Sequence, residues 1–439
     1  MMCNTKKEVT VFLLLLCMGV HAASYCFNMR SDKNTFVSHS NLSANHSSDS
    51  VMVGKGDMTT YESYLYDTIG RCLKDDEIVI KMFSLLKENG QTEYGALSVR
   101  KEYKEPHAYT LFDENELIRE LERGDTLYAD TIVASMFLRP LREELDGVRK
   151  IFFIPAGKMH LFAIEYCNAG EGLMLSEKYD FYRLTSSAVL THRDDIREKI
   201  KSYVIYGGID FEMYPDFEEQ YDGEATKSRY GYLEDSYLAA KEVHNYLRNK
   251  GFSGTLYANE AATETSFKIL QWQNYQLLFI ETHGVFDPRQ GENPYPNALM
   301  LAGASYVMDG GIVPDGKEDD LLTTKEIANL DLSSVDLAVI SACKSAIGEI
   351  DNHGVDGLMR AFKNAGVNSL VMTTDDVVDY VSGEVWKVFF KNIANGKDKR
   401  ESLLDAVKNV RTINDGFYSA PKYWTPYILI DGLDEEKSW

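Results

Sequence analysis

The chain has 439 residues, enough for one large domain or two ordinary ones with substantial cores. Its hydrophobic content of 44% and charged content of 26% are typical of a soluble globular protein. The formal net charge of −22 repels nucleic acid and anionic membrane surfaces, so we expect neither as a partner. A basic partner would suit this charge, although an acidic composition more often serves solubility than binding.

Residues 1–23 are predicted to be a secretory signal peptide. Lysines precede an apolar run from Val9 to Val20, and the small residues Ala22 and Ala23 suit a cleavage site. The run is short for a membrane span. The alternative is the start of a buried helix or a truncated upstream repeat, since Glu8 stands directly before the run. Removal of the segment would make the protein periplasmic or secreted, without membrane attachment; otherwise it would be cytoplasmic.

Residues 24–60 are predicted to form a flexible linker, because positions 31–50 are rich in Ser and Asn and lack periodicity. The cysteines beyond the signal peptide are scattered, without C-x-x-C spacing: Cys26, Cys72, Cys167 and Cys343. This pattern predicts neither a zinc site nor a disulfide framework, and we expect no metal and no cofactor. Cys343 is expected to be a free thiol.

Residues 61–195 are predicted to form a mixed, β-rich N-terminal lobe with ordered structure beginning near Tyr61. The segments EIVIKMF (77–83) and ALSVRKEY (96–103) flank a polar stretch, as in an antiparallel hairpin. Leu117, Ile118 and Leu121 lie at helical spacing within 114–148. A second hairpin is expected over KIFFIPAGKMHLFAIE, with its turn at Ala156 and Gly157.

Residues 196–439 are predicted to form an α/β lobe with a mostly parallel central sheet. Short, nearly continuous apolar runs suit strands buried on both faces: SYVIYGG, QLLFIETHG, DLAVISAC, NSLVMTT and PYILIDG. Helical patterns lie between them at 233–251, 355–366 and 401–410. Alternation of strands and helices indicates a layered α/β sandwich.

Two of these predicted strands end at reactive side chains. LLFIET is followed by His283 and Gly284, and LAVISA is followed by Cys343. Functional groups in open α/β sheets gather at the carboxyl ends of strands. If the two strands are neighbours, the imidazole can take the thiol proton and later protonate a leaving amine. The backbone N–H groups of Cys343 and Gly284 could then stabilise an oxyanion.

The structural alternative is that Cys343 is a packing residue and His283 a buried structural histidine. A histidine and a cysteine separated by 60 residues are not specific by spacing alone. No G-x-S-x-G elbow and no G-x-x-x-x-G-K-[ST] loop occurs in the sequence, which disfavours a serine hydrolase and a nucleotide hydrolase.

Several segments, in order, resemble the CHAT family of caspase-like cysteine peptidases related to caspases and separase. ETHGVFD resembles the family's histidine motif, and VDLAVISACKSAIG resembles its cysteine block. Four further segments resemble the family pattern: FFIPAGKMHLFAIEYC, NALMLAG, HGVDGLMRAFKNAGVNSLVMT and PKYWTPYILIDG. The likeness extends from about Tyr61 to Gly432.

This resemblance implies a caspase-like fold in which His283 is the catalytic histidine and Cys343 the nucleophile. It implies a protein or peptide substrate and activation by a protein partner. The sequence departs from the family at two places near the expected cleft. Asp375 stands where the family has Trp. His353, which Asn352 precedes, stands where the family has Glu. These departures put specificity in doubt more than chemistry.

Cleavage after Arg or Lys is the expected specificity. Asp379 matches the acidic residue that reads a basic side chain in arginine-specific relatives, and Asp375 and Asp376 are its neighbours. The alternative is that these aspartates form a solvated loop or cap the helix expected at 381–393. For the whole chain, the alternative to a peptidase is a non-catalytic interaction or scaffold module, which need not keep the histidine and the cysteine.

Overall fold

The structure is a computed structural model that describes residues 66, 68–101, 103–193, 199–213, 230–286, 297–313, 315–351 and 354–434. The predicted signal peptide, the predicted linker, Asn352 and His353 lie outside these residues. None of the helices in the described ranges is both long and apolar enough to cross a membrane.

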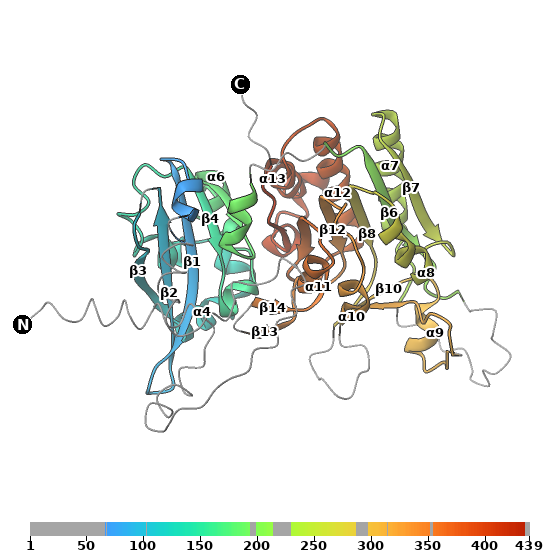
Figure 1. Cartoon of the computed structure of the whole chain (residues 1–439), viewed down its shortest axis with the longest axis horizontal. Coiled ribbons are helices and arrows are strands. Elements are labelled where there is room, and N and C mark those ends of the chain that lie inside the picture. The colour runs from blue at the N-terminus through green and yellow to red at the C-terminus, as the bar shows by residue number, and fades with distance from the viewer. Residues whose placement is uncertain are drawn as a thin grey trace, which may run out of the picture.

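A single sheet of 11 strands runs through the molecule (Figure 1). Its strand order is β3-β2-β1-β4-β5-β16-β15-β12-β8-β6-β7. We call residues 66–193 the N-terminal lobe and residues 199–434 the C-terminal lobe. The N-terminal lobe contributes β1 (Glu77–Leu86), β2 (Thr92–Arg100), β3 (His107–Asp113), β4 (Lys150–Ile154) and β5 (Asp180–Arg183). The C-terminal lobe contributes β6 (Ser202–Ile209), β7 (Ser253–Asn259), β8 (Leu277–Glu281), β12 (Leu337–Ser341), β15 (Ser369–Thr373) and β16 (Tyr427–Ile430).

The predicted first hairpin is confirmed, since β1 and β2 pair antiparallel with Val79 opposite Val99. The predicted second hairpin is wrong. After β4 the chain enters the short 3₁₀ helices η2 (Gly157–His160) and η3 (Ile164–Tyr166), and β4 pairs in parallel with β1 and β5. The Tyr94 hydroxyl accepts the Lys158 N–H at 2.8 Å, which holds the chain in this turn instead of a returning strand.

Short helices cover the N-terminal lobe. They are α4 (Glu114–Leu121), η1 (Gly124–Tyr128), α5 (Ile132–Leu138), α6 (Leu175–Lys178) and η4 (Ser187–His192). Asp113 begins α4, because its side chain accepts the Asn115 N–H and Glu116 closes the capping box. Leu117 is the fully buried residue of this helix. The helical spacing expected within 114–148 therefore corresponds to three separate short helices.

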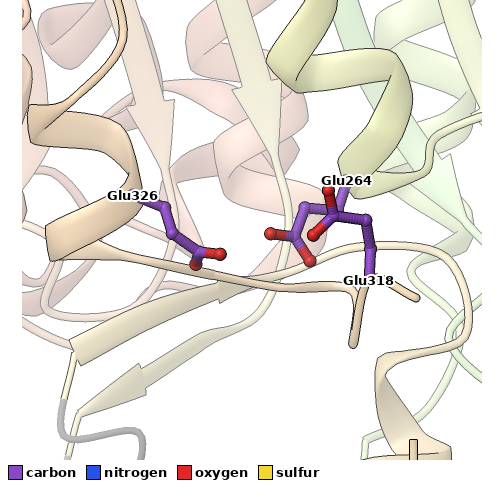
Figure 2. Close-up of side chains that lie close together, drawn as sticks. All are labelled: Glu264, Glu318 and Glu326. Atoms are coloured by element: carbon purple, nitrogen blue, oxygen red, sulfur yellow. The ribbon is translucent and has the colours of Figure 1, made fainter. Parts of the chain in front are cut away.

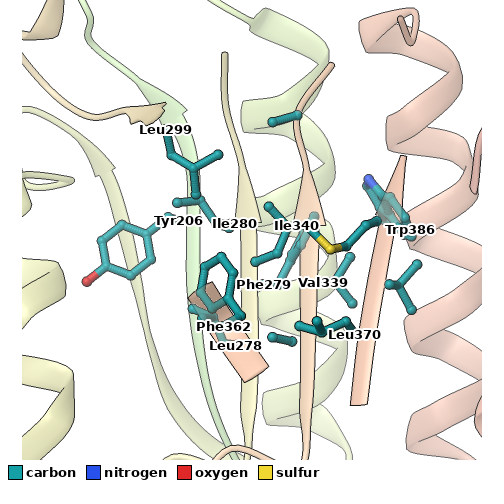
Figure 3. Close-up of a cluster of buried hydrophobic side chains, with 14 of the residues drawn as sticks. Tyr206, Leu278, Phe279, Ile280, Leu299, Val339, Ile340, Phe362, Leu370 and Trp386 are labelled. Atoms are coloured by element: carbon teal, nitrogen blue, oxygen red, sulfur yellow. The ribbon is translucent and has the colours of Figure 1, made fainter. Parts of the chain in front are cut away.

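The central strands of the C-terminal lobe are buried on both faces, which explains their continuous apolar runs. Every residue of β8, β12 and β15 is buried. The Phe279 ring of β8 contacts Trp386 and Phe390 on one face (Figure 3). The neighbouring side chain Leu278 lies on the other face with Phe362 (Figure 3). Strands β7, β6, β8, β12 and β15 are mutually parallel, and β16 is antiparallel to β15.

Helices cover both faces of this part of the sheet. One layer contains α7 (Glu234–Asn249), α12 (Asp379–Ala394) and α13 (Lys399–Val410), with α12 packed between the other two. Gly383 lets α12 approach α7, since a Cβ there would lie 3.2 Å from the Ala239 Cβ. The other layer contains α10 (Thr324–Ala328) and α11 (Leu358–Asn364). The predicted layered α/β fold, with a mostly parallel sheet and a β-rich N-terminal lobe, is confirmed.

Smaller elements surround the carboxyl ends of the central strands. Strands β9 (Gly284–Phe286), β10 (Asn297–Met300) and β11 (Leu321–Thr323) form one small sheet, and β13 (Glu349–Asp351) pairs with β14 (Gly354–Asp356). The remaining helices are α8 (Glu264–Lys268), η6 (Ile269–Trp272), α9 (Ala304–Met308), η7 (Ile413–Gly416) and η8 (Pro421–Tyr423).

The sheet continues from one lobe to the other where β5 meets β16, through one residue pair, Arg183 and Ile430. Asp431 reinforces this seam. Its buried carboxylate accepts the Thr185 N–H at 2.8 Å and the Thr185 hydroxyl at 2.7 Å, and it pairs with Lys363 at 2.8 Å. Polar contacts thus compensate for the short strand pairing.

Candidate active site

The strands that precede His283 and Cys343 are direct neighbours. β8 and β12 pair in parallel, with Glu281 opposite Ser341. His283 and Cys343 each lie two residues beyond this matched pair, at the same edge of the sheet. The Thr282 N–H donates to the Ser341 carbonyl at 3.0 Å, so the parallel pairing continues to the residue before the histidine. The sheet register therefore places the two predicted catalytic residues at the same edge of the sheet.

The imidazole of His283 is held by contacts that the sequence did not reveal. Its Nε2 lies 2.8 Å from the Gly231 carbonyl oxygen. Because a carbonyl oxygen only accepts, Nε2 carries the hydrogen and Nδ1 carries the lone pair. The rings of Phe211 and Tyr230 lie at 4.8 Å and 5.4 Å from the imidazole. Burial among these groups lowers the pKa of His283, while the Gly231 carbonyl raises it.

The main chain of His283 is fixed from the other side by β10. The His283 carbonyl accepts the Met300 N–H at 3.0 Å, and the Thr282 hydroxyl donates to the Met300 carbonyl at 2.5 Å. No motif pointed to Gly231, which lies 52 residues before His283 in the chain.

Cys343 is a free, partly exposed thiol, in contrast to the fully buried Cys167. Its Sγ lies 4.0 Å from the Val377 carbonyl oxygen. Burial raises the pKa of the Cys343 thiol, the Val377 backbone lowers it, and the nearby Asp376 carboxylate raises it further. At neutral pH the Cys343 thiol is therefore protonated and the His283 imidazole neutral.

The loop after Cys343 is fastened to the end of β15. The Ser345 hydroxyl donates to the Ile340 carbonyl at 2.9 Å, and the Thr373 hydroxyl donates to the Ala342 carbonyl at 2.5 Å. The Ala346 N–H donates to the Thr373 carbonyl at 2.8 Å. These bonds turn the chain sharply after the strand and leave the sulfur at the sheet edge.

Gly284 lies against the backbone of Cys343. A Cβ at position 284 would lie 3.0 Å from the Cys343 carbonyl oxygen and 3.4 Å from the Ala342 Cβ. The absence of a Cβ therefore eases this close approach. The assignment of the Gly284 and Cys343 N–H groups as oxyanion donors stays a prediction.

The three aspartates of the expected substrate loop lie in different surroundings. The Asp379 carboxylate accepts the N–H groups of Asp235 and Ser236, each at 3.0 Å, and so caps the N-terminus of α7. Burial raises the pKa of this carboxyl and the two N–H groups oppose the shift. The side chains of Asp375 and Asp376 are 68% and 67% exposed, and both lie near the Lys344 ammonium. A role of any of the three in substrate binding stays a prediction.

Beneath the site lies Glu281, which sequence reasoning did not single out. Its side chain is buried, Oε1 accepts the Ser341 hydroxyl at 3.3 Å, and Oε2 has no hydrogen-bond partner. The Trp386 Nε1–H also donates to the Ser341 hydroxyl, at 2.9 Å. Burial and the charge of Asp379 raise the pKa of Glu281 well above its ordinary value. Burial thus favours the protonated form of this carboxyl.

Three glutamates gather near the small sheet of β9, β10 and β11: Glu264, Glu318 and Glu326 (Figure 2). The Lys268 ammonium lies among them, at 2.6 Å from Glu264, 2.6 Å from Glu318 and 2.9 Å from Glu326. Burial raises the pKa of Glu264, which favours its protonated form. The ammonium and the protonation of Glu264 reduce the negative charge of the cluster, so we interpret it as a structural ion-pair network that anchors the β11–α10 turn.

Comparison with solved structures gives distant similarities. The Arg-specific cysteine proteinase gingipain R aligns at 9% identity with a TM-score of 0.44, over 73% of this chain and 75% of that chain. A separase–securin complex of Saccharomyces cerevisiae aligns at 10% identity with a TM-score of 0.48, over 85% of this chain. This chain covers 31% of that separase chain. No curated protein matches the sequence.

Comparison with family models gives a match to the CHAT domain over residues 131–431. The match includes His283, Cys343 and the strands that position them. It begins later than the expected limit near Tyr61, so β1, β2 and β3 lie outside the matched range. Because the matched residues make up most of the chain, this protein belongs to the CHAT family.

Proposed function

We propose that the protein is a cysteine endopeptidase that hydrolyses peptide bonds through His283 and Cys343. The observation that carries the proposal is the register of β8 and β12, which sets an imidazole and an accessible thiol at the same edge of the sheet. The tautomer held by the Gly231 carbonyl supports it, since Nδ1 is then the basic nitrogen.

The protonation states define the first step. A thiol with a raised pKa and an imidazole with a lowered pKa do not form an ion pair at rest. The thiol gives its proton to His283 as Sγ attacks the carbonyl carbon of the substrate. The carbonyl oxygen becomes an oxyanion, to which the N–H groups of Cys343 and Gly284 are the proposed donors.

The later steps use the same imidazole in the opposite sense. The His283 imidazolium donates its proton to the amine of the departing peptide, which leaves a thioester on Cys343. His283 then removes a proton from water, which attacks the thioester and releases the acid product. This cycle requires neutral His283 at its start, so activity should fall as the pH drops below the ordinary histidine pKa of about 6.5.

Cleavage after Arg or Lys is the proposed specificity. Asp375 and Asp376 have largely exposed carboxylates near the ammonium of Lys344, the residue after Cys343, and a guanidinium or ammonium could pair with them there. Asp379 would have to release the two amides of α7 to serve in this way. We therefore assign the reading of the basic side chain to Asp375 and Asp376 first, with Asp379 as the third candidate.

The test is cleavage of a peptide library that varies the residue before the scissile bond, by the wild-type protein and the variants Cys343→Ala and His283→Ala. Cleavage confined to Arg and Lys sites and lost in both variants would support the proposal. Full activity of either variant would overturn the dyad. Cleavage after other residues would leave the dyad and remove the specificity assignment.

The second candidate function is a non-catalytic interaction module that is bound, or activated, by a protein partner. The held tautomer and the accessible thiol favour catalysis, since a scaffold has no need of either. Absence of cleavage by the protein alone and in the presence of its co-purifying proteins would favour the scaffold.

A further inference from the structure

Lys344 directly follows the proposed nucleophile and has an unusual backbone conformation. Its φ is 54°, in the left-handed region that residues with a side chain seldom adopt. Its N–H donates to the Asp375 carbonyl at 3.2 Å, which fixes the cysteine loop to the aspartate loop. Strained backbone of this kind gathers at functional sites.

The Lys344 side chain lies on the two acidic residues proposed to read the substrate. Its ammonium is 2.9 Å from Asp376 Oδ2 and 3.8 Å from Asp375 Oδ1. The side chain is 38% exposed, so the pair lies at the surface of the site and can open. In the resting protein, the cation that pairs with these two aspartates is therefore the Lys344 ammonium of the chain itself.

We propose that Lys344 is a specificity-determining residue, an internal occupant of the Asp375–Asp376 pair that a basic substrate side chain must displace. The inference rests on the proposed Arg/Lys specificity and adds a competitor to it. An Arg side chain of the substrate pairs with a carboxylate through two parallel hydrogen bonds, so it gains more by displacing Lys344 than a Lys side chain does, which replaces one ammonium with another. The site should therefore prefer Arg to Lys.

The Lys344 ammonium opposes the binding of a basic peptide, but it favours ionisation of the Cys343 thiol. The positive charge of Lys344 lowers the pKa of Cys343, against the effect of Asp376. Removal of the charge should thus slow the chemistry while it strengthens the binding of basic peptides. Binding must therefore be measured apart from turnover.

The experiment compares the dissociation constants of two peptides that differ only in the residue before the scissile bond. One peptide has Arg there, and the other has citrulline, a neutral isostere of Arg. Both are measured on full-length Cys343→Ala and on the double variant with Lys344→Met. Exposed ion pairs contribute about 0.2–1 kcal/mol, so we expect about 1.4- to 5-fold tighter binding of the Arg peptide to the double variant. The citrulline peptide should bind equally to both proteins.

A Lys344→Arg variant is the matched control, because it keeps the charge and should keep the weaker affinity. Equal or weaker binding of the Arg peptide after Lys344→Met would overturn the inference, as would an equal gain for citrulline. Turnover by the wild-type protein is a separate readout. Charge-dependent binding without any turnover would support the role of Lys344 and contradict the peptidase.

Discussion

Two buried carboxyl groups, one in each lobe, differ in their hydrogen bonding. In the N-terminal lobe, the Glu144 carboxylate accepts hydrogen bonds from the side chains of Tyr109, Tyr103 and His107, at 2.5, 3.0 and 2.7 Å. In the C-terminal lobe, Glu281 has one bond from Ser341 and an oxygen without a hydrogen-bond partner. The first arrangement satisfies a buried charge and stabilises the fold, whereas the second favours a protonated carboxyl near the proposed dyad.

Cys167 in the N-terminal lobe is buried, whereas Cys343 in the C-terminal lobe is partly exposed. Replacement of Cys343 gives the largest effect that we expect on activity. Cys343→Ala should lower kcat/KM by at least about 10³-fold, because it removes the nucleophile. Cys167→Ala should lower the free energy of unfolding by about 1 kcal/mol and leave turnover per folded molecule unchanged. Peptidase assays and urea unfolding of both variants check this contrast. Loss of turnover in Cys167→Ala without unfolding would show that the lobes do not divide these roles.

The seam between the lobes is the next place to test the comparison. Asp431→Ala should lower the free energy of unfolding by about 3 kcal/mol, because it leaves Lys363 without its buried partner and frees Thr185. Asp431→Asn keeps an acceptor for Thr185 and should cost less. Thermal unfolding of the two variants reports the outcome. A single transition that shifts as a whole would mean that the lobes unfold together, and two transitions would mean that the seam is the weaker contact.

The two buried glutamates predict opposite pH effects. The folded-state pKa of Glu281 is raised, so the free energy of unfolding falls as pH rises above the ordinary glutamate pKa of about 4.3. Glu281→Gln removes this dependence and should gain about 1 kcal/mol or more at about pH 8, since each unit of pKa difference is worth about 1.4 kcal/mol.

Glu144 behaves in the reverse sense. Burial alone raises its pKa, but the hydrogen bonds of Tyr109, His107 and Tyr103 outweigh burial and hold it below its ordinary value. Its contribution is present above the ordinary pKa and is lost as pH falls. Glu144→Gln should therefore cost about 2 kcal/mol at about pH 8. Urea unfolding at about pH 5 and about pH 8 measures both variants, and effects of the same sign would contradict the comparison.

The smallest effect concerns Asp379, which links α12 to α7. Asp379→Ala should lower the free energy of unfolding by about 1 kcal/mol, because two amides of α7 lose their cap. Asp379→Asn should retain part of this. Chemical unfolding and the cleavage preference of both variants give the answer. A changed preference with unchanged stability would restore Asp379 as the reader of the basic side chain.

Much of the fold could be predicted because its elements carry strong local signals. The buried strands are continuous apolar runs, and α7, α11 and α13 have regular apolar stripes. The second hairpin was predicted wrongly because the apolar residues after β4 pack as 3₁₀ turns under Tyr94. That outcome depends on a hydroxyl 64 residues away, which no local pattern contains.

The sequence by itself determined the buried central strands, the two reactive side chains that follow β8 and β12, and the membership of the CHAT family. It did so because burial on both faces and strand ends leave local patterns in residue type. Only the tertiary structure decided that the Gly231 carbonyl holds the imidazole, that Asp379 caps α7, and that Lys344 lies on Asp375 and Asp376. These contacts join backbone groups and common charged residues across long sequence separations, where residue type carries no record of the partner.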